Sequence, residues 1–207
     1  MYSAVFFDFD CVILDSVHAK TRAFATMFQQ YGPDIEKAVV DYHLAHGGVS
    51  RFKKFEYYYL NLLHKPIDEK TMNHLGREFN RLALMDVLNA SFIPGALETL
   101  EDLKRENIPC FVASGTPDEE VKYIVEARNL APYFLEVHCS PKKKDEILLD
   151  IADRYDLNLS TCLFIGDAMT DYEAAQQAGA CFLGILSNGG ISPFPKGTIV
   201  KKVVTVD

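Results

Sequence analysis

Short apolar runs rich in β-branched and aromatic residues recur along the chain, and a polar residue closes each one. The first, residues 2–7, ends at Asp8. A continuous apolar run, unlike an alternating one, is typical of a strand buried on both faces of a parallel sheet. We predict five such strands: residues 2–7, 108–114, 134–140, 161–167 and 181–186.

Helical periodicity fills the intervals between these strands. Residues 96–106 carry Leu97, Leu100 and Leu103 at helical spacing, and residues 118–128 and 145–155 show the same pattern. Regular alternation of strands and helices predicts an α/β fold with a doubly wound, Rossmann-like parallel sheet.

Local signals predict where two of the helices begin and where one of them ends. Thr116 with Glu119, and Thr170 with Glu173, have the spacing of a capping box. Gly179 follows the second of these helices and is predicted to cap its C-terminus.

One long segment interrupts the alternation. Between residues 16 and 92 we find helical patterns and no convincing strand. We therefore predict a helical lobe at 16–92, inserted into an α/β core that comprises residues 1–15 and 93–207.

Composition narrows the class of protein. With 207 residues and 48% hydrophobic content, the chain can form one ordinary core and a small second lobe. A formal charge of -8 argues against a nucleic-acid partner, because affinity for a phosphate backbone depends on clustered Lys and Arg. No apolar run is long enough to span a membrane, and no signal peptide is evident, so we expect a cytoplasmic protein without a membrane partner.

Polar residues gather where the predicted strands end. In an open α/β sheet, ligands bind outside the carboxyl ends of the strands, so these residues are expected to converge on one site. They form four sets: Asp8 with Asp10, Ser114-Gly115-Thr116, the lysines at 142–144, and Asp167 with Asp171.

Crowded carboxylates repel one another unless a cation joins them. Oxygen ligands favour Mg²⁺ over zinc, and no Cys/His set has the spacing of a zinc site. Each set also has a simpler interpretation when taken alone: Ser114 or Asp167 could be a helix N-cap, and the lysines could be a solvated surface. Only their conjunction at successive strand ends favours a functional site.

The order of these motifs resembles that of the haloacid dehalogenase superfamily, in its phosphatase branch. The matching segments are "DFD", "VASGTP", "SPKKKDEIL" and "IGDAMTDYEAA", and they span the predicted core almost end to end. The helical lobe after the first motif is similar to the cap domain of that family.

This resemblance implies roles for individual residues. Asp8 would attack phosphorus and form an aspartyl-phosphate, and Asp10 would act as general acid and base. Mg²⁺ would be held by Asp8, Asp10 and Asp167, with Asp171 in support.

The phosphoryl group would be bound by other residues. Ser114 and one lysine would hold its oxygens, and Gly115 would bind the substrate beside them. We choose Lys144 because it directly precedes a predicted helix, and Lys142 is the alternative.

Within the lobe, "GGVSR" resembles a cap segment of β-phosphoglucomutase, a member of the same superfamily. That resemblance implies that Arg51 binds a second anionic group of the substrate. The alternative is an exposed Arg51 in the first turn of a helix that Ser50 caps.

The favoured function is thus a Mg²⁺-dependent phosphatase acting on a small phosphorylated metabolite, such as a sugar phosphate. A phosphomutase is the second hypothesis, although Pro117 stands where the mutase has a basic residue. A phosphate-binding protein without turnover is the third, and it fits less well because every catalytic motif is present.

Overall fold

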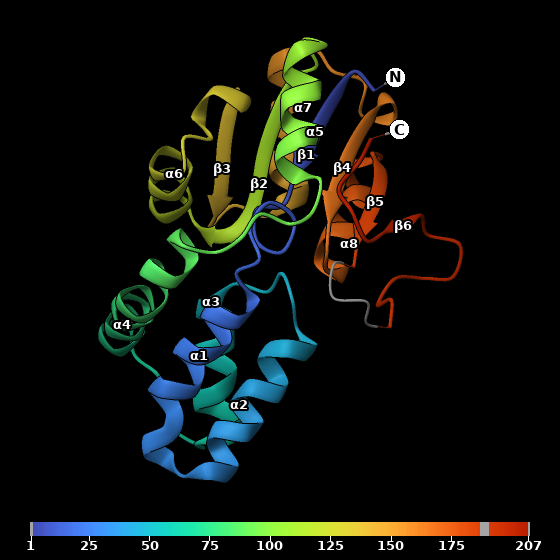
Figure 1. The fold of residues 1–207 in the computed structure, drawn as a ribbon. Coiled ribbons are helices and arrows are strands. Elements are labelled where there is room, and N and C mark those ends of the chain that lie inside the picture. Colours follow the sequence, from blue (N-terminus) through green and yellow to red (C-terminus); the bar gives the residue numbers. More distant parts are fainter. Residues whose placement is uncertain (1, 187–190, 207) are drawn as a thin grey trace. The chain divides into compact units, whose positions relative to one another are not determined.

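Six strands form one parallel sheet in the computed structural model, which describes residues 2–186 and 191–206 (Figure 1). Their order across the sheet is β3-β2-β1-β4-β5-β6, and every neighbouring pair is parallel. The strands are β1 (Ala4–Phe7), β2 (Cys110–Pro117), β3 (Glu136–Ser140), β4 (Cys162–Gly166), β5 (Cys181–Ile185) and β6 (Val200–Lys201). The predicted doubly wound α/β fold is confirmed, with β6 as an additional short strand.

The strand order reverses direction beside β1. From β1 the chain proceeds through β2 to β3 on one side, and then crosses to β4 and β5 on the other side. The carboxyl ends of β1 and β4 therefore meet at a topological switch point, which is where open α/β sheets bind ligands.

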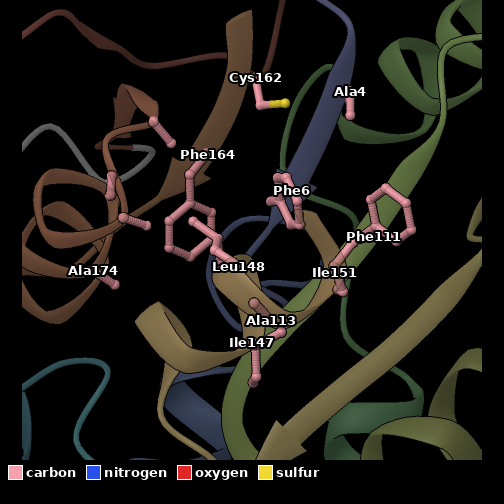
Figure 2. Close-up of a cluster of buried hydrophobic side chains, with 13 residues drawn as sticks. Ala4, Phe6, Phe111, Ala113, Ile147, Leu148, Ile151, Cys162, Phe164 and Ala174 are labelled. Carbon is pink, nitrogen blue, oxygen red and sulfur yellow. The ribbon is translucent and has the colours of Figure 1, made fainter. Parts of the chain in front are cut away.

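Two helices cover one face of the sheet. They are α7 (Lys144–Tyr155) and α8 (Met169–Ala178). Figure 2 shows Phe6, Phe111 and Phe164 of the strands packed with aliphatic side chains of α7. The Phe6 and Phe111 rings are stacked at 5.1 Å between centroids. Helix α5 (Ala96–Arg105) lies on the other side of the sheet, and α6 (Asp118–Ala127) packs against β2 and β3 (Figure 1).

The chain divides into two compact units. One comprises Met1–Asp15 with Ser91–Asp207, and contains the whole sheet. The other, Ser16–Ala90, contains the four helices α1 (Val17–Phe28), α2 (Pro33–Ala45), α3 (Arg51–Tyr57) and α4 (Glu69–Leu88), with a π-helical turn at Tyr58–Leu62. That the helical unit acts as a cap stays a prediction.

Aromatic side chains form the core of the helical unit. The Phe24 ring lies 4.5 Å from that of Phe79, 5.6 Å from that of Tyr58 and 5.7 Å from that of Phe55. These four residues have less than 2% of their surface exposed, so they are packing residues of the helical unit.

The two predicted N-terminal capping boxes are wrong. Helix α6 begins after Pro117, and the Thr116 hydroxyl instead donates a hydrogen bond to Asp10. Helix α8 begins at Met169, where the Asp171 carboxylate accepts from the Ala168 backbone N–H. The C-terminal prediction is confirmed, because Gly179 has a left-handed conformation with φ 77°.

None of the helices in the described part of the chain combines the length and the apolar character that crossing a membrane requires.

Substitution of two neighbouring leucines of α7 tests which face of that helix packs against the core. Leu148 is fully buried and Leu149 is 50% exposed. We expect Leu148→Ala to lower the free energy of unfolding by about 2–5 kcal/mol, because it leaves a cavity. Leu149→Ala is the matched control and should change it by less than about 1 kcal/mol. Urea denaturation measures both, and equal effects would contradict the packing of α7.

Candidate active site

The switch point of the sheet brings together four charged residues from three segments. Asp8 follows β1, Lys144 is the first residue of α7, Asp167 follows β4, and Asp171 lies in the first turn of α8. Burial is nearly complete for Asp8, Lys144 and Asp171, which are 2%, 7% and 0% exposed.

Lys144 pairs with two of the three carboxylates. Its Nζ lies 3.0 Å from Oδ2 of Asp8 and also donates to Oδ1 of Asp171. Burial disfavours the charge of Lys144, but the carboxylates of Asp171 and Asp8 outweigh it and raise the pKa of this lysine. Lys144 is therefore positively charged at neutral pH.

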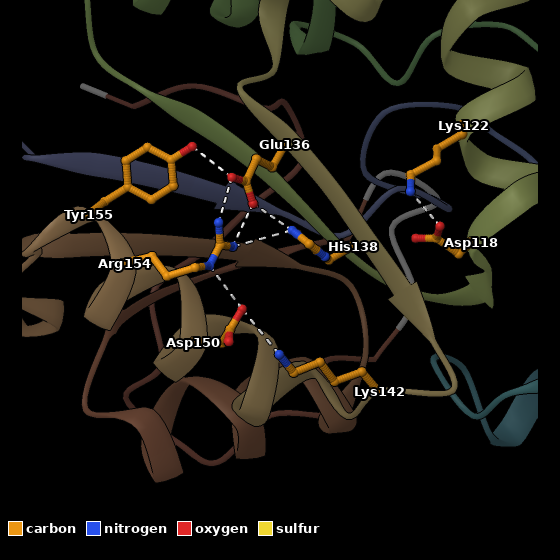
Figure 3. Close-up of polar contacts among 8 residues, drawn as sticks. All are labelled: Asp118, Lys122, Glu136, His138, Lys142, Asp150, Arg154 and Tyr155. Carbon is orange, nitrogen blue, oxygen red and sulfur yellow. Dashed lines mark hydrogen bonds and ion pairs between the residues drawn. The ribbon is translucent and has the colours of Figure 1, made fainter.

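Lys142, the alternative considered from sequence, lies elsewhere. Its Nζ pairs with Oδ2 of Asp150 at 3.1 Å, and its side chain is 39% exposed (Figure 3). Of these two lysines, Lys144 is the one that contacts Asp8 and Asp171.

Asp8, Asp167 and Asp171 form a compact acidic group. One carboxylate oxygen from each lies within 4.8 Å of the others. Burial raises the pKa of Asp8 to about 7; Lys144 opposes that rise, whereas Asp171 and Asp10 add to it. Burial raises the pKa of Asp167 as well, and Asp8 and Asp171 reinforce the rise. The group thus has the electrostatic character of a site for a cation.

The donor atoms fit a hard divalent ion. All three side chains offer carboxylate oxygens, which suit Mg²⁺. Asp171 already has both oxygens engaged, Oδ1 with Lys144 and Oδ2 with the Ala168 N–H at 3.0 Å. Asp8 is engaged in the same way, Oδ1 with the Phe9 N–H and Oδ2 with Lys144. Which of the three carboxylates bind an ion directly stays a prediction.

A glycine allows Asp171 to reach this position. A Cβ at Gly166, the last residue of β4, would lie 2.2 Å from Cβ and 2.7 Å from Oδ2 of Asp171. Any side chain there would displace the Asp171 carboxylate. In the "GD" pair of the last motif, Gly166 therefore provides space and Asp167 provides a charge.

Asp10 is held from the neighbouring strand. Its Oδ2 accepts a hydrogen bond from the Thr116 hydroxyl at 2.7 Å, and the Thr116 backbone N–H donates to Oγ of Ser114 at 3.2 Å. The β2–β3 pairing is irregular between Ser114 and Pro117, and Gly115 lies within that irregularity. Ser114 is 1% exposed, and it ends the regular part of β2 next to Asp10 in this network.

The role of Thr116 is not the one that its sequence predicts. Thr116 belongs to the second polar set, but its spacing to Glu119 predicts a helix cap, whereas its hydroxyl orients Asp10. The available signal was its place in "SGT", two residues after Ser114 at the end of a buried strand.

Cys11 has an unusual backbone conformation in the turn after Asp10. Its φ is 59°, and its N–H donates to the Leu14 carbonyl at 2.8 Å. This left-handed conformation costs a residue with a side chain about 1–2 kcal/mol. The turn therefore imposes strain at a position that would suit glycine.

Arg51 of α3 is buried and contacts Phe79 of α4. It is 7% exposed, and its guanidinium lies 4.4 Å from the centroid of the Phe79 ring. The alternative of an exposed first-turn arginine is therefore wrong, and Ser50 makes no side-chain cap. Contact between Arg51 and a substrate stays a prediction.

The sheet and the acidic group define a doubly wound α/β protein that carries buried charged residues at its switch point. The chain belongs to the haloacid dehalogenase-like hydrolase family, whose model matches residues 2–179.

Individual proteins are similar to this chain at lower levels of sequence identity. Phosphoglycolate phosphatase from Vibrio parahaemolyticus is 29% identical over 97 residues, which cover 44% of this chain and 42% of that protein. The match thus spans less than half of that relative.

Two solved structures share the fold. β-Phosphoglucomutase from Clostridium difficile has a TM-score of 0.77 and 22% identity, covering 97% of this chain and 91% of that one. A haloacid dehalogenase hydrolase from Entamoeba histolytica also has a TM-score of 0.77, with 20% identity, covering 96% and 92%. Identities this low establish a common fold only.

Lys144 and Lys142 provide a test of the buried ion pairs. We expect Lys144→Met to lower the free energy of unfolding by about 3–5 kcal/mol, because it leaves buried carboxylates without a counter-charge. Lys142→Met removes an exposed pair and should cost about 1 kcal/mol or less. Urea denaturation at neutral pH compares the two variants. A larger loss in Lys142→Met would show that the charges are not arranged as described.

Proposed function

We propose that the protein is a metal-dependent phosphatase that hydrolyses a small phosphorylated metabolite through an aspartyl-phosphate. The observation that carries this proposal is the pairing of Lys144 with Asp8, beside a second carboxylate, Asp10, which Thr116 holds separately. Two carboxylates in different environments can take different roles in one reaction.

Asp8 is the nucleophile in this proposal. Its Oδ1 accepts from the Phe9 N–H at 2.7 Å, and its Oδ2 faces Lys144 at 3.0 Å, so the carboxylate has a fixed orientation. A bond forms between an Asp8 oxygen and phosphorus as the bond from phosphorus to the leaving oxygen breaks. The positive charge of Lys144 favours the ionised carboxylate that this attack requires.

Asp10 is the proton donor and acceptor. It gives a proton to the leaving oxygen in the first step, and in the second it takes one from the water that attacks the phosphoryl group. Free phosphate then leaves and the Asp8 carboxylate is restored. The hydrogen bond from Thr116 keeps Asp10 oriented during both transfers.

The remaining residues bind the phosphoryl group and the metal. Ser114, Lys144 and the backbone at Gly115 would hold the phosphoryl oxygens. Asp8, Asp167 and the Asp10 backbone carbonyl would hold Mg²⁺, with Asp171 in support. The ion would neutralise charge that develops on the phosphoryl oxygens.

Hydrolysis of p-nitrophenyl phosphate tests the reaction and its dependence on metal. We expect activity with Mg²⁺ that EDTA removes, no activity in Asp8→Asn, and a loss of about 10²–10⁴ in kcat in Asp10→Asn. Asp102→Asn, at an exposed position of α5, is the control and should be fully active. Full activity in Asp8→Asn would contradict the proposed nucleophile.

A panel of sugar monophosphates and bisphosphates tests the substrate class and the role of Arg51. We propose that Arg51 binds a second anionic group, so Arg51→Ala should raise KM for such substrates about 10–100-fold, the loss of one charge-assisted hydrogen bond. KM for p-nitrophenyl phosphate should not change, because that compound has no second anionic group.

Lys53→Ala, at an exposed position of the same helix, is the control. The same panel separates the two enzyme hypotheses. Release of free phosphate supports the phosphatase, whereas an isomerised product without phosphate release would establish a phosphomutase.

A further inference from the structure

Strand β3 forms one edge of the sheet. It pairs with β2 on one side, and it is the outermost strand in the order of the sheet. Every residue of β1 and β4 is buried, but in β3 only Cys139 is. An edge of this kind offers backbone N–H and C=O groups for pairing with another strand.

A groove crosses this edge from one face of the sheet to the other. It has a volume of about 510 Å³. Lys122, Val125 and Glu126 of α6 line one side, and Arg154 of α7 lines the other. Between them the lining is largely apolar, and it includes Leu135, which is 59% exposed.

Side chains of β3 alternate between the two faces. Glu136 and His138 point toward α7, where Nε2 of His138 lies 2.6 Å from Oε2 of Glu136 (Figure 3). Arg154 donates two hydrogen bonds to the Glu136 carboxylate, and these bonds lower the pKa of Glu136. Leu135, Val137 and Cys139 alternate with this pair and therefore take the α6 side.

We propose that a second copy of this chain pairs with β3 in antiparallel register about a two-fold axis at Val137. In this register Glu136 lies opposite His138 of the second copy, and Leu135 lies opposite Cys139. On one face, each Glu136 carboxylate, already bound by Arg154 of its own chain, then lies across from the imidazole of the second copy. On the other face, the two Val137 side chains lie opposite each other, beside the exposed Leu135. A register centred on Glu136 is disfavoured because it would oppose two carboxylates.

Charge complementarity identifies the occupant as a second copy. The chain has a formal charge of -8, so two copies repel each other over most of their surface. The groove differs, because charges of both signs lie next to each other there: Lys122 pairs with Asp118 beside Glu126, and Arg154 pairs with Glu136 and Asp150. A surface that carries both signs side by side is complementary to its own two-fold copy.

Sedimentation velocity over a range of concentrations tests this dimer. The wild-type protein is expected to form a dimer, and Leu135→Asp should raise its dissociation constant about tenfold or more, because it places a charge in the apolar part of the interface. Leu149→Asp is the matched control: Leu149 is 50% exposed on α7, and the substitution should have no effect.

A charge swap tests the register and does not depend on Leu135. His138→Glu should weaken the dimer, and the double variant Glu136→His/His138→Glu should restore it, because the swap returns the opposite pairs. Thermal unfolding monitored by circular dichroism shows that each variant is folded. A wild-type protein that stays monomeric, or a dimer that neither Leu135→Asp nor His138→Glu weakens, would overturn the proposal.

Discussion

The pairing of Lys144 with Asp8 and Asp171 is the interaction on which the site depends. Carboxylates buried at the end of a parallel sheet raise each other's pKa and disfavour folding unless a cation balances them. Lys144 supplies that charge because α7 begins directly after the loop that follows β3. Asp171 can take part in this pairing because Gly166 leaves room for its side chain. Residues from three separate segments therefore meet in one set of ion pairs.

A second contact between strands sets the position of Asp10. The Thr116 hydroxyl reaches Asp10 from β2, where the pairing with β3 becomes irregular after Ser114. That irregularity turns the chain at the carboxyl end of the strand, so the hydroxyl faces β1. Asp8 and Asp10 are two residues apart but are held by different partners, Lys144 and Thr116. The proposed roles of nucleophile and general acid require two such different environments.

Sequence patterns predicted the five main strands and the convergence of acidic residues at the carboxyl ends of the strands. Continuous apolar runs and carboxylates at strand ends are both local signals. They did not predict the role of Thr116, since its spacing to Glu119 matched a capping box and its true partner lies 106 residues away in the chain. Strand β6 has two residues and is too short to give a pattern. The burial of Arg51 depends on residues of other helices, such as Phe79, and the periodicity along one helix gives no information about them.

Buried ion pairs give little net stability, and apolar residues of similar volume often stabilise a fold equally well. A fold selected for stability alone would therefore place apolar side chains where Asp8, Lys144 and Asp171 lie. In the core cluster beside them the side chains are indeed apolar, from Phe6 to Ala180. Stability does not explain why these three charges are buried together at the switch point. A reaction that needs an oriented carboxylate and a fixed positive charge does explain it, and this contrast supports placing the chemistry at that end of the sheet.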